Sequence, residues 1–101
     1  MGNGFLEAVY QEALALEMEM RAIPFRAQVP LEIIYKDQKL QHSYIPDFVV
    51  YDKIIVELKA IQALGANEEA QLLNYLRISG IRVGLLLNFA RPKLKFERLV
   101  V

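Results

Sequence analysis

The sequence predicts an α/β fold of the mixed, α+β kind, with two helices and one mixed sheet in the order α-β-β-β-α-β-β. Stretches rich in strong helix formers stand at residues 4–21 and 68–79, and stretches of strand character lie between and after them. A strand that follows a helix after earlier strands commonly joins their sheet in parallel orientation. With 101 residues, 54% of them hydrophobic, residues 1–101 are expected to form one domain.

The first helix is expected over residues 4–21, where apolar residues interleave with glutamate and glutamine and no proline occurs. Pro24 ends it, because proline lacks an amide donor and moves the preceding residue out of the helical region. Residues 28–35 then alternate apolar and polar side chains, which is typical of a half-buried strand. The polar residues 36–39 turn the chain into a strand towards Tyr44, so three or four antiparallel strands are expected before the second helix.

Two apolar stretches, 45–51 and 54–60, flank Asp52-Lys53 and predict a hairpin. The consecutive apolar residues 54–56 favour a strand that is covered on both faces. Both strands of this hairpin are therefore expected at the centre of the sheet.

The second helix is expected to have Asn67 as its N-cap, because the two glutamates that follow complement the helix dipole. Gly80 ends it. Residues 82–87 then form a short apolar strand, and residues 93–100 alternate in the manner of an edge strand. Basic residues of the last segment either contact a phosphate backbone or keep the exposed edge from pairing with another chain, and overall neutrality favours the second role; they are Arg91, Lys93, Lys95 and Arg98.

Charge and composition exclude several classes of protein. Twelve Lys and Arg residues balance twelve Asp and Glu residues, so any contact with nucleic acid must be local. The absence of cysteine excludes a disulfide scaffold, a thiolate zinc site and a cysteine nucleophile. No apolar run reaches the roughly 18 residues that span a bilayer, and the start lacks a signal-peptide pattern, so we expect a cytoplasmic location and no membrane partner.

Charged residues interrupt the predicted hairpin at Pro46-Asp47 and at Glu57-Leu58-Lys59. Residues two apart on a strand share a face, so Glu57 and Lys59 project together. If Asp47 joins them, two carboxylates supply the oxygen ligands that Mg²⁺ or Mn²⁺ prefers, beside an ammonium group that can orient water. This pattern indicates a phosphodiester hydrolysis site; the alternative is a structural ion pair, with Asp47 as a turn residue.

The register of the hairpin decides whether the carboxylates meet. A two-residue turn would place Asp47 opposite Leu58, where it faces the wrong side of the sheet. We therefore expect an odd register. It arises either from a three-residue loop that pairs Tyr51 with Ile55 and sets Asp47 opposite Lys59, or from a bulge at the preceding proline.

Residues 4–10, Gly-Phe-Leu-Glu-Ala-Val-Tyr, match Gly-x-x-Glu-x-x-Tyr, and nearly the whole chain resembles the GxxExxY proteins of the PD-(D/E)xK nuclease superfamily. The acidic and basic residues of the hairpin are similar to the metal-binding core of that superfamily, and residues 71–75 are similar to the Gln-x-x-x-Tyr motif of its exonuclease-like members. Together, and in this order, these weak motifs make a specific match. The resemblance implies a restriction-endonuclease-like core. Family members usually carry a further helical stretch before the glycine, and we expect this chain, which begins at Met1-Gly2-Asn3, to lack it.

The resemblance implies a role for each residue of the hairpin motif. Asp47 and Glu57, with the backbone carbonyl of Leu58, would hold Mg²⁺ or Mn²⁺. Lys59 would position the attacking water and stabilise the charge that develops on the phosphate. These four residues would form the catalytic centre.

The resemblance also implies supporting residues on both helices. Glu7 would add a carboxylate to the metal shell, directly or through water, and Tyr10, on the same helix face, would support Glu7. Gln71 and Tyr75 lie one helical turn apart. They would orient the catalytic lysine or touch the substrate backbone.

We therefore expect a metal-dependent nuclease that acts on DNA, with RNA as the alternative substrate. A second interpretation is a catalytically inactive nuclease-fold module that binds nucleic acid or a protein partner, and metal binding separates it from the first. A third is a structural subunit that forms a homodimer. A dimer that survives high salt without metal would favour this third interpretation.

Overall fold

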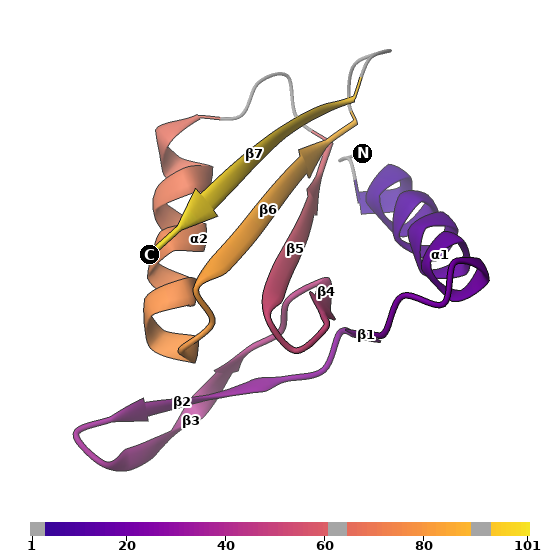
Figure 1. The fold of residues 1–101 in the computed structure, drawn as a ribbon. Coiled ribbons are helices and arrows are strands. Elements are labelled where there is room, and N and C mark those ends of the chain that lie inside the picture. Colours follow the sequence, from indigo (N-terminus) through magenta and orange to yellow (C-terminus); the bar gives the residue numbers. More distant parts are fainter. Residues whose placement is uncertain (1–3, 61–64, 90–93) are drawn as a thin grey trace.

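The computed structural model describes residues 4–60, 65–89 and 94–101. In chain order its elements are α1 (Gly4–Met20), β1 (Phe25–Ala27), β2 (Leu31–Tyr35), β3 (Gln38–Tyr44), β4 (Phe48–Val50), β5 (Ile54–Lys59), α2 (Ala66–Ser79), β6 (Val83–Asn88) and β7 (Lys95–Val100). The main sheet has the strand order β1-β4-β5-β6-β7, and β2 and β3 form a separate two-stranded sheet. Figure 1 shows this β2–β3 hairpin projecting from the rest of the domain.

The two helices and the mixed sheet confirm the predicted fold class. β5 and β6 run parallel, with Ile54 opposite Val83, whereas the other neighbouring strands of the main sheet run antiparallel. As predicted, β4 and β5 are interior strands and β7 lies at an edge. The helix α2 provides the connection that returns the chain from the end of β5 to the start of β6, which a parallel pair requires (Figure 1).

One helix packs on each face of the main sheet (Figure 1). Because successive side chains of a strand alternate between faces, Val56 and Leu58 of β5 point towards α1, whereas Ile55 points towards α2. The buried cluster on the α1 side comprises Met18, Phe48, Val50, Val56, Leu58, Ala60 and Phe89. The cluster on the α2 side comprises Tyr44, Ile55, Leu72, Leu76 and Leu86. Glu57 and Lys59 therefore project on the α2 side.

The segment between α1 and β2 differs from the prediction. β1 is an additional strand that pairs with β4, so five strands rather than three or four separate the helices. The strand expected from residue 28 begins at Leu31, because Gln28 has a φ of 54° and donates its N–H to the carbonyl of Asp47 at 3.1 Å. Three residues are too few to display a period of two, and β1 therefore left no readable pattern in the sequence.

The ends of α2 confirm one prediction and correct another. Gly65 is the N-cap instead of Asn67, and the Gly65 N–H donates to the Glu68 side chain at 2.9 Å. Asn67 lies within the first turn. Gly80 ends the helix as predicted, with a φ of 79° that suits glycine. A Cβ on Gly84 would stand 2.8 Å from Leu72 Cδ2, so a side chain there would displace the buried side chain of Leu72 between α2 and β6.

Neither helix in the described ranges has the length and apolar character needed to cross a membrane.

Candidate active site

The β4–β5 hairpin turns through three residues, as the requirement for an odd register predicted. The loop comprises residues 51–53, and Tyr51 and Asp52 both have a φ of 56°. The predicted pairing was wrong by two residues, because Val50 rather than Tyr51 lies at the last pair, opposite Ile54. Tyr51 adopts a left-handed backbone conformation and is the first residue of the turn. Continued by one pair, the observed register places Asp47 opposite Glu57 instead of opposite Lys59.

Asp47 lies directly before β4, where the ladder between β4 and β5 ends at the pair Phe48 and Val56. Its N–H donates to Glu57 Oε1 at 3.3 Å, and its Oδ2 accepts the N–H of Leu58 at 2.7 Å. The Asp47 side chain thus takes the place of a strand beside the end of β5. Two carboxylates from neighbouring strands meet at this open edge.

The backbone of β5 presents a carbonyl at the same edge. The N–H and C=O groups of one strand residue point to the same side of the strand. Because the Leu58 N–H binds Asp47, the Leu58 carbonyl also faces the Asp47 side. Lys59 shows the expected alternation, since its carbonyl accepts the N–H of Phe89 on the opposite side at 3.0 Å.

Glu7 reaches this edge from α1. Its Oε2 accepts the N–H of Ala60 at 3.1 Å, one residue beyond β5. Asp47 and Glu7 thereby bind the two amides that flank the Leu58 carbonyl. The helix with the Gly-x-x-Glu-x-x-Tyr pattern therefore brings its glutamate to the end of β5.

Tyr44 is a residue of the site that the sequence analysis missed. It ends β3, and its hydroxyl donates a hydrogen bond to Glu57 Oε2. Its ring stacks on Tyr75 of α2 with the centroids 3.7 Å apart and the planes 6° apart. Tyr75 therefore reaches Glu57 through Tyr44. The position of Tyr44, three residues before Asp47, is the one signal that could have drawn attention to it.

Burial and the neighbouring carboxylate change the ionisation of Glu57. Desolvation is the main cause that raises the pKa of Glu57 to about 7, and the charge of Asp47 acts in the same direction, whereas the hydrogen bond from Tyr44 lowers this pKa. Burial, followed by the charge of Glu57, raises the pKa of Tyr44 above its ordinary value. The Tyr44 hydroxyl therefore stays protonated and remains a donor. Glu57 is a carboxylate that a nearby positive charge would help to ionise.

Three of the implied residues have looser connections. Lys59 projects on the same face as Glu57 and is partly exposed, and within the described ranges it forms no ion pair. Gln71 is exposed on α2, and no hydrogen bond joins it to another described side chain of the site. Tyr10 stacks on Phe89, with centroids 4.0 Å apart, on the α1 side of the sheet. It therefore anchors the helix that carries Glu7.

The donor set suits a hard divalent cation in part. Asp47 and Glu57 are in direct contact, and the carbonyl of Leu58 faces the same edge. In the part of the chain that the structure describes, no three His, Cys, Asp or Glu side chains come together as a metal-binding group. Glu7 is held at the amide of Ala60 rather than in a carboxylate cluster with the other two. Two carboxylates with one backbone carbonyl are therefore the ligands that this geometry offers.

These motifs and this geometry agree with the comparison of the sequence with protein-family models. The model of the PD-(D/E)XK nuclease superfamily matches residues 1–99. The chain belongs to this superfamily. No curated protein matches the sequence of this superfamily member.

Among solved structures, this PD-(D/E)XK domain is similar to the crystal structure of a protein named SSO0001. The TM-score is 0.76 at 14% sequence identity, and the match covers 97% of this chain and 52% of the other. At this identity the likeness shows the fold. The chain spans about half the length of that protein.

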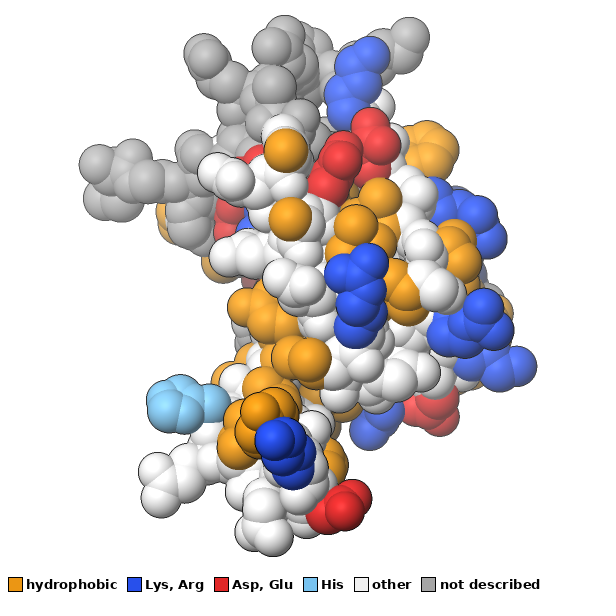
Figure 2. All heavy atoms as spheres, turned by 90° about the vertical axis from the view of Figure 1, so that its left-hand side faces the viewer, with side chains coloured by type: hydrophobic (Ala, Val, Ile, Leu, Met, Phe, Trp, Pro, Cys, Tyr) orange, Lys and Arg blue, Asp and Glu red, His pale blue; other side chains and the backbone are white. Residues whose placement is uncertain are grey.

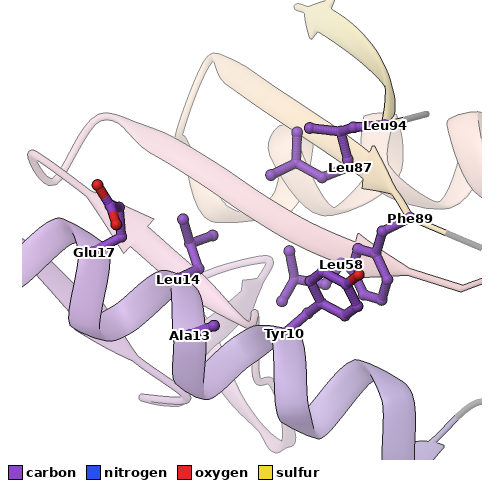
Figure 3. A pocket seen from close by; sticks show the side chains of 8 residues that line it. All are labelled: Tyr10, Ala13, Leu14, Glu17, Leu58, Leu87, Phe89 and Leu94. Carbon is purple, nitrogen blue, oxygen red and sulfur yellow. The ribbon is translucent and has the colours of Figure 1, made fainter. Parts of the chain in front are cut away.

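A cavity of about 360 Å³ separates α1 of the PD-(D/E)XK domain from the sheet. Figure 3 shows its largely apolar lining, with Glu17 at one end and the stacked rings of Tyr10 and Phe89 at the other. Leu58 contributes its side chain to this cavity while its backbone belongs to the candidate active site. The cavity thus lies on the opposite face of the sheet from Glu57 and Lys59.

Proposed function

We propose that this protein is a metal-dependent phosphodiester hydrolase that cleaves DNA. The observation that carries the proposal is the junction of Asp47 with β5. There Asp47 Oδ2 accepts the N–H of Leu58 at 2.7 Å, and the Asp47 N–H donates to Glu57. This junction aligns two carboxylates and one backbone carbonyl at an open strand edge, as the chemistry of a PD-(D/E)XK nuclease requires.

In this proposal, Asp47, Glu57 and the Leu58 carbonyl hold Mg²⁺ or Mn²⁺, since oxygen donors suit both ions. When bound, such an ion supplies an activated water and offsets negative charge on the phosphate. Lys59 projects on the same face as Glu57, where its ammonium group orients the water and stabilises the charge that develops during in-line attack. The raised pKa of Glu57 fits a site that becomes fully ionised when a cation is present.

The supporting residues have different tasks in this proposal. Tyr44 fixes one oxygen of Glu57, and Tyr75 holds the Tyr44 ring in place. Glu7 binds the Ala60 amide and contributes to the metal shell through water. Gln71, exposed on α2, contacts the substrate backbone rather than the metal. Each assignment predicts a smaller loss of activity than removal of Asp47.

An inactive nuclease fold that binds nucleic acid or a protein is the competing function. One observation favours it: the hydrogen bonds from Tyr44 and from Leu58 each occupy one carboxylate oxygen, of Glu57 and of Asp47 respectively. In that case Asp47 is a structural cap for β5. Removing it would then lower stability without changing any cleavage.

The finer assignments of the sequence belong to the same proposal. Residues 4–10 support membership of the GxxExxY branch, residues 1–101 are proposed to form one domain, and the proposed location is the cytoplasm. DNA is the proposed substrate, with RNA as a substrate to be tested in the same assay. A homodimer would supply additional contacts to a substrate for which this neutral chain has few charges.

Cleavage assays test the proposal directly. Labelled single-stranded, double-stranded and branched DNA, with the matching RNA strand, would be incubated with Mg²⁺, with Mn²⁺ and with EDTA. Asp47→Asn should abolish metal-dependent cleavage, whereas Asp52→Asn should retain it. Asp52 is a suitable control because it lies on the hairpin loop and pairs with Arg26 at the surface. Equal cleavage by wild type and Asp47→Asn would contradict the proposal.

A further inference from the structure

The register of β7 assigns its charged residues to different faces of the sheet. Lys95 lies opposite Asn88, whereas Arg98 lies opposite Leu85. Directly paired residues share a face. Gly84 and Leu86 pack towards α2, so Asn88 and Lys95 belong to the α2 side, which is the side of Glu57. Leu85 packs against the α1 cluster, and Arg98 therefore lies on the other face.

Lys59 and Lys95 lie in one row with Asn88 between them. Lys59 is the partner of Asn88 on β5, and Lys95 is its partner on β7. Two strand spacings separate the lysine backbones by roughly 10 Å. The row crosses the sheet at the carboxyl end of β5, directly beyond Glu57. It extends the candidate active site sideways over three strands.

The side chains of the row are polar where the strands otherwise bury apolar residues. Asn88 is 3% exposed and is the buried polar residue of the described chain, following Gly84 and Leu86 on the same face. Neither lysine of the row forms an ion pair with a described carboxylate. Figure 2 shows Lys and Arg side chains along one margin of the side of the molecule on which α2 lies. Both ammonium groups are thus available to an external anion.

Protection of the edge strand does not explain the row. A charge hinders pairing of an edge strand with another chain on either face, so Arg98 serves that purpose as well as Lys95. The alignment of Lys95 with Lys59 requires a reason on the α2 face. Arg91 and Lys93, the other basic residues noted in the sequence, lie outside the described residues.

The geometry points to a row in which Lys59 and Lys95, on either side of the buried Asn88, bind phosphates and hold the DNA strand beside the scissile phosphate. The inference rests on the proposed function and adds the direction of the substrate: from Asp47 and Glu57 across β6 to the β7 edge. Lys95 binds a neighbouring phosphate, and Asn88, buried between the two lysines, is neutral and adds no negative charge beside them. Glu97, two residues from Lys95 on the same face, repels the substrate from the middle of the sheet.

Salt-dependent DNA binding tests the row without requiring catalysis. Anisotropy of a fluorescein-labelled DNA duplex in EDTA would be measured over a range of salt for wild type, Lys95→Ala, Arg98→Ala and Glu97→Gln. Arg98→Ala is the matched control on the same strand and the opposite face. Lys95→Ala should reduce the slope of log affinity against log salt by about 0.9, the value for one lost phosphate contact. Arg98→Ala should leave the slope unchanged, and Glu97→Gln should strengthen binding.

A second variant tests the buried member of the row. Asn88→Asp keeps the size of the side chain and places a negative charge between the lysines, so it should weaken binding at least as much as Lys95→Ala. Circular dichroism would establish that the variants are folded. An unchanged slope in Lys95→Ala, an equal loss in Arg98→Ala, or no DNA binding by the wild type would overturn the row.

The outcomes also separate this inference from the proposed function. Metal-dependent cleavage with an unchanged slope in Lys95→Ala would remove the row and leave the hydrolase. A reduced slope in Lys95→Ala without metal binding or cleavage by the wild type would retain the row on a binding module.

Discussion

The two faces of the main sheet differ most at the carboxyl end of β5. On the α1 side, Val56 and Leu58 are buried in an apolar cluster. On the α2 side, Ile55 is fully buried, but Glu57 and Lys59 follow it and are partly exposed. Because side chains alternate between the two faces of a strand, the core residue Leu58 lies between Glu57 and Lys59 of the candidate active site. One strand can therefore stabilise the fold through one face and carry candidate active-site residues on the other. Substitutions on β5 should remove either contribution without the other.

The largest effect on activity is expected on the α2 side of β5, where Glu57 and Lys59 lie. Lys59→Ala should reduce metal-dependent DNA cleavage by about 10²- to 10³-fold, because a charge that stabilises the transition state is lost. The free energy of unfolding should change by less than ~1 kcal/mol. Single-turnover cleavage and urea unfolding would measure the two quantities, with Lys53→Ala in the hairpin loop as the control. If Lys59→Ala lost cleavage because it no longer folded, the idea that the two faces of β5 contribute separately to stability and activity would be contradicted.

The opposite result is expected one residue earlier. Leu58→Ala should lower the free energy of unfolding by about 2–5 kcal/mol, because it enlarges the cavity beside α1 and removes contacts from the buried cluster. Urea unfolding monitored by circular dichroism measures this change. A cost below about 1 kcal/mol would show that the α1 face contributes little to the fold at this end of the strand.

Glu57, on the α2 side of β5, should also make the free energy of unfolding depend on pH. The pKa of Glu57 rises from 4.5 to about 7 on folding, so the folded protein holds this proton more tightly than the unfolded chain. In EDTA, the stabilisation is complete below pH 4.5 and is lost as the pH rises to about 7, by at most about 3 kcal/mol at roughly 1.4 kcal/mol per pKa unit. Glu57→Gln should remove this contribution. If wild type and Glu57→Gln showed the same dependence of unfolding free energy on pH, the raised pKa of Glu57 would be contradicted.

Tyr44→Phe should have the smallest effect of the series. It removes the hydroxyl that lowers the pKa of Glu57 and keeps a ring to stack on Tyr75. The pKa of Glu57 should therefore rise further, and Mn²⁺ binding should require a higher pH than in the wild type. Calorimetric titrations at several pH values would detect the shift. A midpoint that moves to lower pH would contradict the assigned hydrogen bond.

Much of the fold and part of the site could be predicted from the sequence, for identifiable physical reasons. The helix formers of α1 and α2 and the apolar runs of β4 to β6 are long enough to show their periods. The demand that Asp47 meet Glu57 predicted an odd loop. The exact partners depended on the left-handed backbone of Tyr51 and Asp52, which no side-chain pattern announces.

Other features of the site depend on tertiary packing. Tyr44 reaches Glu57 only because the end of β3 packs beside α2, and no local pattern encodes that approach. The N-cap lies at Gly65 rather than at Asn67, and the Gly65 N–H donates to the side chain of Glu68. The position of Gln71 at the surface likewise follows from how α2 rotates on the sheet. Motif spacing could identify candidate residues but not these contacts.

Calorimetric titration of Mn²⁺ into the wild type, Asp47→Ala and Glu57→Ala tests the central claim most directly, with circular dichroism to establish that all three are folded. The claim is that Asp47 and Glu57 form a metal site at the open edge of β5. It predicts binding by the wild type and loss of binding in both folded variants. A wild type that binds no Mn²⁺ at millimolar concentration, or folded variants that bind as well as the wild type, would contradict it.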